Sequence, residues 1–326
     1  MQKLVYHDVK AAFDLTAQLI IRCIAKVTDA YKLDKKVKRE FQPLGSIAFD
    51  SRILTWKLDK NEVSIWTVDG RIKNLPFVCH DRAKELLDGD RGESDLCLID
   101  GEFYLFTSCE VNEPTSKDVD DFLGVDLGIK NIASDSDGNQ YAGNKVNSLR
   151  KRHLKLRAKL QSKGTKSAKR LLKKRSRKEK RFAKDVNHQI AKQIVERAKD
   201  TNRGIALEDL TGIRERVTVK KAQRSQHSAW SFHDLRSKIG YKAQLQGVPF
   251  ILVDPRNTSK ACNSCGCIDS RNRPDQSTFR CVSCGHSANA DTNAALNIRV
   301  RGRAAVNRPY VSTTAISARQ GQAHVL

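Results

Sequence analysis

Two pairs of cysteines toward the C-terminal end constrain the fold of this chain most strongly. Cys262 and Cys265 are separated by two residues, and after fifteen further residues Cys281 and Cys284 repeat that spacing. A glycine follows the second cysteine of each pair, as tight turns around a metal ion require. The spacing is typical of a zinc ribbon, in which four thiolates hold a structural zinc ion and leave no open position for chemistry. Disulfides are the alternative, and the odd total of nine cysteines argues against a pure disulfide framework.

The remaining ligand-type side chains allow simpler interpretations. Cys267 and His286 lie next to the four cysteines and could substitute for one of them, but we expect that they do not. The other cysteines stand in apolar patterns and are predicted to be small buried residues: Cys23, Cys79, Cys97 and Cys109. The loop of the predicted ribbon also carries three arginines, which make a second nucleic-acid contact plausible: Arg271, Arg273 and Arg280.

The positive charge of the chain is concentrated in one segment. Residues 145–184 contain 19 Lys/Arg and a single acid, Glu179, and so carry +18 of the net +23. A solvated helix face usually mixes both signs, whereas an unbalanced run is better explained by a polyanion that neutralises it. Leucine spacing predicts two helices with a break near Gly164 that grip a phosphate backbone without reading sequence. The expected contacts are Arg150, Lys151, Arg152, Lys169, Arg170, Lys173, Lys174 and Arg175.

The pattern of the chain changes twice along its length. Residues 8–31 have helical periodicity, and residues 46–111 alternate as strands, with hairpin turns at two Asp-Gly pairs. A small β-barrel or sheet is predicted there, followed by a polar connector at 112–121. From residue 122 strands alternate with helices, which predicts an α/β layer with a mixed sheet. A last helix begins at residue 291, and the tail beyond about residue 303 is predicted to be disordered.

Three acids stand at the boundaries of apolar elements in this α/β section. Asp126 follows a strand pattern, Glu208 ends another, and Asp291 opens the last helix. Each has a simpler reading, as a turn acid, a strand-end acid or a helix N-cap respectively. Together they suggest a Mg²⁺ site, because ionised carboxylates in apolar surroundings cost free energy unless paired or bound to metal. Beside a polyanion-binding surface, such a cluster indicates a nuclease or a strand transferase.

Three segments in this order also carry a resemblance: "GVDLGIKNIA", "IALEDLTGIR" and "TSKACNSCG…FRCVSCGHSANADTNAALNI". They resemble the three RuvC motifs and the inserted zinc ribbon of the OrfB/TnpB family of insertion-sequence transposases, which are similar to type V CRISPR effector nucleases. The match covers residues 122–300. The resemblance implies an RNase H-like fold and cutting of target DNA directed by a transposon-encoded guide RNA, with no membrane or small-molecule partner.

The resemblance also implies roles for individual residues and a division into domains. Asp126, Glu208 and Asp291 match the catalytic, Mg-binding acids, and the four cysteines match the zinc ligands. Asp209 adjoins Glu208 but would point to the opposite face of an extended segment, which favours Glu208. The implied domains are a helical recognition-lobe remnant (1–45), a β-rich wedge domain (46–121) and a RuvC-like nuclease domain (122–302). The nuclease domain contains the basic helical segment 145–200 and the ribbon 261–286, and the tail is 303–326.

Two functional classes remain open at this point. The first is a metal-dependent, RNA-guided DNA endonuclease acting in a prokaryotic cytoplasm. The second is a binding protein without cleavage, a relic or domesticated regulator, because the first residues resemble an interior helix of the recognition lobe and the chain looks truncated. True strand transfer uses similar metal chemistry and is not excluded by the residues alone. Trp230 and Phe232 suit either core packing or stacking on bases, with core packing favoured.

Overall fold

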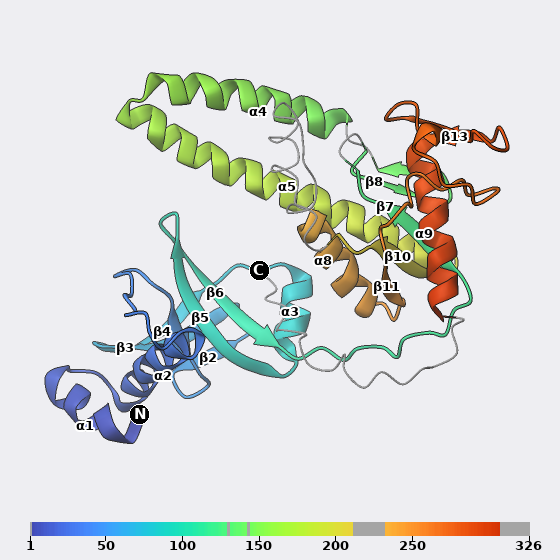
Figure 1. Cartoon of the computed structure of the whole chain (residues 1–326). Coiled ribbons are helices and arrows are strands. Elements are labelled where there is room, and N and C mark those ends of the chain that lie inside the picture. Colours follow the sequence, from blue (N-terminus) through green and yellow to red (C-terminus); the bar gives the residue numbers. More distant parts are fainter. Residues whose placement is uncertain (1, 129–130, 142–143, 211–231, 307–326) are drawn as a thin grey trace. The chain divides into compact units, whose positions relative to one another are not determined.

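The computed structural model describes residues 2–128, 131–141, 144–210 and 232–306 (Figure 1). The chain divides into two compact units, the first ending at Asn112 and the second beginning at Glu113. Within the described residues, no helix is both long enough and apolar enough to cross a membrane.

The first unit begins with two helices where the periodicity predicted one. Helices α1 (Gln2–Ala12) and α2 (Ala17–Leu33) are separated by a short break, so the prediction of one continuous helix over 8–31 was wrong. The cause lies at Thr16, whose extended backbone (φ −64°, ψ 151°) makes it the N-cap of α2. Leu19 and Ile20 of α2 are then buried.

Two antiparallel sheets form the rest of the first unit. One contains β1 (Ile47–Phe49), β5 (Arg91–Ile99) and β6 (Glu102–Cys109), and the other contains β2 (Leu54–Lys57), β3 (Glu62–Thr67) and β4 (Gly70–Pro76). Both Asp-Gly hairpins are confirmed, and Gly70 and Gly101 have φ of 102° and 94°. The short helix α3 (Asp81–Asp88) was not predicted, because its eight residues interrupt an otherwise strand-rich region.

The second unit is built around a mixed five-stranded sheet, as predicted. Its strands are β7 (Phe122–Asp126), β8 (Ala133–Asp135), β9 (Gln140–Tyr141), β10 (Gly204–Glu208) and β11 (Phe250–Val253), in the order β11-β10-β7-β8-β9. Strand β10 runs parallel to both β7 and β11, whereas β8 is antiparallel to β7 and to β9. The parallel strands are almost fully apolar, as strands buried on both faces are.

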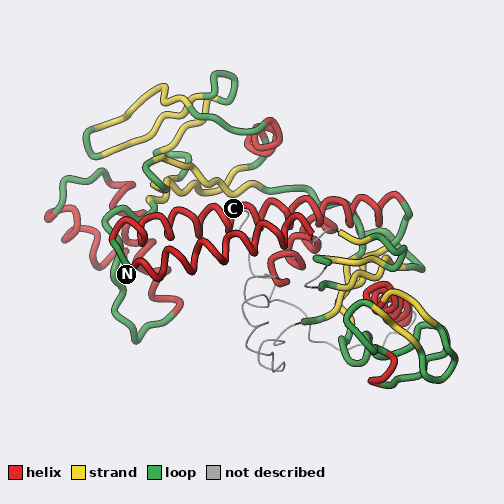
Figure 2. The backbone as a smooth tube through the Cα atoms, turned by 90° about the horizontal axis from the view of Figure 1, so that it is seen from above, coloured by secondary structure: helices red, strands yellow, loops and turns green. Residues whose placement is uncertain are grey.

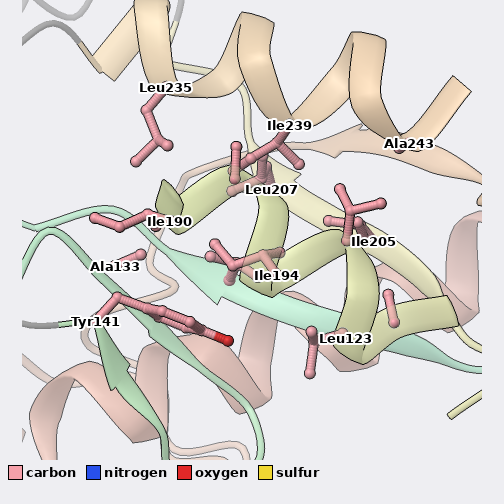
Figure 3. Close-up of a cluster of buried hydrophobic side chains, with 14 of the residues drawn as sticks. Leu123, Ala133, Tyr141, Ile190, Ile194, Ile205, Leu207, Leu235, Ile239 and Ala243 are labelled. Carbon is pink, nitrogen blue, oxygen red and sulfur yellow. The ribbon is translucent and has the colours of Figure 1, made fainter. Parts of the chain in front are cut away.

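Helices cover both faces of this sheet, because side chains alternate between the faces along each strand. Leu123 and Leu207 belong to a core with α5 (Lys166–Asp200) and α8 (Phe232–Gln244), and Figure 3 shows how the side chains of Ile194 and Ile239 lie in it. The alternate residues Phe122 and Ala206 instead form a core with Ile298 of α9 (Ala290–Val306).

Phe232 packs on the core that contains Leu123 and Leu207, in agreement with the favoured prediction of core packing. Trp230 lies outside the described residues.

Helix α9 lies unusually close to the sheet. A Cβ atom added at Gly124 of β7 would stand 2.1 Å from the carbonyl oxygen of Ala295 and 2.5 Å from the amide nitrogen of Arg299. At the other end, Gly302 approaches Phe122 and Ala206 in the same way. Helix α9 therefore runs antiparallel to β7, and its first turn lies at the carboxyl end of that strand.

The basic segment forms a helical hairpin, visible in Figure 2 as two long helices side by side. Helix α4 (Asn144–Lys163) ends before Gly164, which has φ 62°, and Thr165 caps α5 by accepting from the amide of Ala168 at 3.2 Å. The predicted break near Gly164 is confirmed. Helix α5 continues past the basic residues and ends at Asp200.

Two further predictions need correction, one on where the last helix ends and one on the burial of four cysteines. Helix α9 extends to Val306, past the start predicted for the disordered tail, and residues 307–326 lie outside the described part of the chain. The four cysteines predicted to be small buried residues are not fully buried: Cys23 is exposed, and Cys79, Cys97 and Cys109 are half-buried. Cys23, Cys97 and Cys109 lie on partly solvated faces of α2, β5 and β6, and Cys79 lies in the loop between β4 and α3. Periodicity alone does not show how much of each face the rest of the protein covers.

Candidate active site

Two of the three predicted acids lie side by side at one edge of the central sheet. Asp126 is the last residue of β7 and Glu208 the last residue of β10. The strands are parallel, and Leu207 pairs with Val125, so the next residues on each strand are also neighbours. Phe122 and Ala206 face α9, and by alternation Asp126 and Glu208 lie on that same face.

Asp291 reaches this edge from the first turn of α9. The N-cap role that a helix-opening acid could have belongs instead to Asn289, whose Oδ1 accepts from the amides of Asp291 at 3.0 Å and Thr292 at 3.2 Å. The carboxylate of Asp291 is free for other contacts. It accepts a hydrogen bond from Nδ2 of Asn131 at 3.1 Å and lies 3.6 Å from the guanidinium of Arg273.

The three carboxylates interact electrostatically. Burial raises the pKa of Asp126 to about 8, and the negative charges of Glu208 and Asp291 add to this effect, while Arg273 opposes it. Burial also raises the pKa of Glu208, against the hydrogen bond that the Thr258 hydroxyl donates to its Oε1. Neighbouring acids with raised pKa values form a site that a divalent cation would stabilise by neutralising them.

Asp209 turns away from this site. Its carboxylate lies 2.9 Å from the guanidinium of Arg236 on α8, which covers the opposite face of the sheet. This is the arrangement expected from strand alternation, and it leaves Glu208 as the acid on the α9 side.

The carboxylate oxygens of the three acids do not all lie within 4.8 Å of one another. In the part of the chain that the structure describes, the four cysteines are the one group of three or more His, Cys, Asp or Glu residues whose ligand atoms all lie within 4.8 Å of one another. A pair of metal ions about 3.5–4 Å apart needs ligands spread around both ions. The donor set, three carboxylates with no soft ligand, fits hard cations such as Mg²⁺.

The cysteine module, residues 261–289, brings the two predicted cysteine pairs together. Sγ of Cys262 lies 3.7 Å from that of Cys284, and Sγ of Cys265 lies 3.5 Å from that of Cys281. Thiolates about 2.3 Å from a tetrahedral zinc ion would be about 3.8 Å apart. The cluster is therefore compatible with a zinc site. Neither Cys267 nor His286 belongs to it.

The two halves of the module have the same local geometry. Gly266 and Gly285 have φ of 76° and 73°, and their amides donate to the carbonyl oxygens of Cys262 and Cys281 at 2.9 and 3.1 Å. Backbone amides lower the pKa of Cys281 to about 6, with Cys284 contributing most, which favours a thiolate. Strands β12 (Thr278–Arg280) and β13 (Ser287–Asn289) close the module.

The predicted phosphate-contacting residues lie along the α4–α5 hairpin. Arg152 on α4 is exposed, as are Lys169, Arg170, Lys173 and Lys174 on α5, and Arg150 and Lys151 lie in α4. Arg175 is half-buried, with its guanidinium 3.4 Å from Nδ1 of His153. Glu179, the one acid of residues 145–184, accepts from Arg157 between the two helices, which leaves the exposed residues of the hairpin strongly basic.

Sequence reasoning missed the residues that hold the carboxylates. Arg273 was expected to contact nucleic acid and in fact faces Asp291, while Asn131, Asn289 and Thr258 were not singled out. Asn131 and Thr258 do lie inside the quoted motif segments, but nothing in a single sequence tells that their partners are distant acids.

Comparison with known proteins defines the class to which this fold and site belong. Residues 106–211 match the family model described as "Probable transposase" (OrfB_IS605), and residues 232–298 match that described as "Cas12f1-like, TNB domain". The chain is 33% identical to a TnpB-like protein of Methanocaldococcus jannaschii over 261 residues, covering 75% of this chain and 92% of that protein. The chain belongs to the family of TnpB-like proteins.

Other relatives match smaller parts of the chain. A CRISPR-associated endodeoxyribonuclease Cas12f1 of Sulfoacidibacillus thermotolerans is 42% identical over 36% of this chain, and a Cas12f1 of Syntrophomonas palmitatica is 29% identical over 63%. The chain spans only 27% and 42% of the lengths of these two relatives. The structure of a Cas12f1-sgRNA-target DNA complex matches with a TM-score of 0.55 at 19% identity, over 78% of this chain and 58% of the other, and so shares the fold.

Proposed function

We propose that this protein is a transposon-associated, RNA-guided, metal-dependent DNA endonuclease with an RNase H-like (RuvC) nuclease domain. The observation that carries the proposal is that Asp126 and Glu208 end neighbouring parallel strands, with Asp291 of α9 near enough to act electrostatically on Asp126. Relatives named as endodeoxyribonucleases support the same class, as does the likeness of fold to a Cas12f1 chain whose structure includes sgRNA and target DNA.

The three acids would hold Mg²⁺, and each residue has a distinct task. Bound divalent ions supply Lewis-acid stabilisation of the scissile phosphate and an activated water. Asp126 and Glu208, fixed by adjacent parallel strands, and Asp291, at the start of α9, would supply the carboxylate ligands. The guanidinium of Arg273 faces this site and carries a positive charge, so it can orient a phosphate there.

The remaining parts follow the same proposal. The cysteine module is a zinc ribbon whose closed site is structural. The first unit holds helices of a recognition lobe and the wedge domain. The exposed lysines and arginines of the α4–α5 hairpin contact the backbone of the guide–target duplex, while base pairing reads the sequence.

The test is plasmid cleavage by the protein co-expressed with the RNA region that flanks its gene. Wild type in Mg²⁺ should cut a plasmid bearing the matching target, and Asp126→Ala should lower the rate by about 10³-fold or more, since several kcal/mol of stabilisation are removed. Nucleic-acid binding by Asp126→Ala should stay near normal, because the substitution removes a hard-cation ligand and keeps every phosphate-binding side chain.

Asp209→Asn is the matched control, because this neighbouring acid lies on the other face of the sheet. Cutting that is equal in wild type and Asp126→Ala would contradict the proposed site. Binding of RNA and DNA without any cutting would favour the alternative, a nucleic-acid-binding relic or regulator. Joined instead of cut DNA ends would identify strand transfer.

A further inference from the structure

The cysteine module lies between two parts of the carboxylate site. The segment before it contacts Glu208, and helix α9 after it carries Asp291. This placement indicates that the module does more than hold a structural zinc ion. We propose that the module positions Glu208 and Asp291 for divalent-metal binding, through Thr258, Asn293 and Asn297 as positioning residues. The inference rests on the proposed function, because it concerns the same carboxylates.

The incoming segment, residues 254–260, leads from β11 to the module and holds Glu208. Thr258 is buried, with 2% of its surface exposed, and its hydroxyl donates to Oε1 of Glu208. The carbonyl oxygen of Pro255 lies 2.9 Å from the same hydroxyl. The Thr258 hydroxyl has one proton and so donates to only one of these two acceptors at a time. When it donates to Oε1 of Glu208, it fixes this carboxylate and leaves Oε2 available to a metal ion.

Two asparagines of α9 hold the chain where it enters the module. Nδ2 of Asn297 donates to the carbonyl oxygens of Thr258 and Ala261, both at 2.8 Å. Nδ2 of Asn293 also donates to Ala261, at 2.9 Å, and its Oδ1 accepts from the amide of Asn263 at 3.1 Å. Asn293 is fully buried, so these bonds have no competition from water. The helix that carries Asp291 is thereby tied to the segment that fixes Glu208.

The outgoing end of the module sets the start of α9. Asn289, the last residue of β13, caps the helix, and the amide of Ala290 donates to the carbonyl oxygen of Ser277 at 2.9 Å. Asp291 follows directly and is also faced by Arg273 from within the module. The position of Asp291 therefore depends on the module folding around its metal.

One buried side chain links both cysteine pairs to the incoming segment. Nδ2 of Asn272 donates to the carbonyl oxygens of Lys260 at 2.9 Å and Cys267 at 3.0 Å, and its Oδ1 accepts from the amide of Val282 at 2.9 Å. Metal binding by the cysteines holds these loops in place, and the bonds to Lys260 and Ala261 pass that order to Thr258.

The test uses Mn²⁺ as the probe ion and measures its affinity by calorimetry on full-length protein with zinc bound. Thr258→Val keeps the size of the side chain and removes the hydroxyl, whereas Thr258→Ser keeps the hydroxyl. Since partners of metal ligands are worth about 10–100-fold in affinity, Thr258→Val and Asn297→Ala should weaken Mn²⁺ binding by about that factor, with Thr258→Ser close to wild type. Zinc content should stay unchanged in all three.

Two controls separate positioning from general loss of stability and from failure of the site itself. Asp121→Asn removes the ion pairs of Asp121 with Arg299 and Arg303, which loosens the far end of α9 without touching the module, so it should lower Tm and leave Mn²⁺ affinity unchanged. Wild-type affinity in both Thr258→Val and Asn297→Ala, or an equal loss in Asp121→Asn, would overturn the positioning role alone. Equal Mn²⁺ binding by wild type and Asp126→Ala would overturn the proposed metal site, and the positioning role with it.

Discussion

The cysteine cluster and the carboxylate cluster differ in how the chain brings them together. The four cysteines come from one stretch, residues 262–284, and two tight turns with positive φ suffice to gather them. Asp126, Glu208 and Asp291 come from two strands and a helix, and meet only because the strand register and the packing of α9 are correct. The locally built cysteine site can therefore survive changes that displace the carboxylate site, which is assembled from distant elements.

The largest effect is expected from removal of zinc. Structural zinc in small modules contributes about 10 kcal/mol or more to folding, so chelation or Cys281→Ser should unfold the cysteine module. The central sheet should persist, because its cores are separate from the small core around Phe279. Hydrogen exchange should show reduced protection in β12 and β13 and retained protection in β7 and β10. Equal reduction in all four strands would show that the two regions are not separable.

Gly124→Ala should have the opposite selectivity. The new methyl group would meet backbone atoms of Ala295 and Arg299, which cannot move independently of α9, so a destabilisation of about 3 kcal/mol is expected. Denaturant unfolding measures that destabilisation, and Mn²⁺ affinity should fall while zinc content stays constant. Gly240→Ala is the control, because its nearest neighbour, a Phe250 ring carbon, is 3.5 Å away. If Gly124→Ala kept wild-type Mn²⁺ affinity, α9 packing would not control the carboxylates.

Asp137→Asn should give a smaller, pH-dependent loss of stability in the unit that contains the central sheet and the carboxylate site. Hydrogen bonds from Arg203 and Arg197 lower the pKa of Asp137 from 3.8 to about 2. Solvent screens these exposed ion pairs, so the contribution to stability is about 1 kcal/mol. A lowered pKa stabilises the fold above about pH 4, and this contribution disappears as the pH falls toward 2. Thermal unfolding of wild type and variant should therefore differ at pH 7 and converge near pH 2. A constant difference across that range would rule out the ion pairs as its cause.

Substitutions on the α4–α5 hairpin should have the smallest effect on either metal site. Replacing Lys169, Arg170, Lys173 and Lys174 by alanine removes exposed charges only, so zinc content and Mn²⁺ affinity should not change. The slope of log affinity for nucleic acid against log salt should decrease by about 0.9 for each phosphate that the variant no longer neutralises. The control is Lys192→Ala with Lys199→Ala. These exposed lysines lie on the half of α5 that packs on the sheet, and their loss should leave the slope unchanged. An unchanged slope in the fourfold variant would exclude the hairpin from the interface.

The contrast between the two sites explains how much the sequence could predict. Spacing of two residues within each cysteine pair already limits the backbone to a tight turn, and the Asp-Gly hairpins are encoded just as locally. The mixed sheet and the break near Gly164 also follow from local patterns. The acids could be nominated by their apolar surroundings, and Asp209 could be set aside by strand alternation.

The missed contacts have non-local causes, whereas two of the errors arose from neighbouring residues. The continuous helix predicted over 8–31 overlooked the N-cap at Thr16, and α3 was hidden within a strand-rich region. The N-cap role considered for Asp291 belongs to Asn289, two residues earlier. Asn131 and Thr258 contact acids 160 and 50 residues away, and pairings at such distances depend on sheet register and helix packing instead of periodicity.

The most direct test of the carboxylate site is anomalous diffraction at the manganese edge from crystals of the zinc-loaded protein grown with Mn²⁺. The account predicts manganese peaks bounded by Asp126, Glu208 and Asp291, and their loss in crystals of Asp126→Ala with the zinc peak unchanged. Peaks that persist in Asp126→Ala, or wild-type crystals with manganese absent from these three carboxylates, would contradict it.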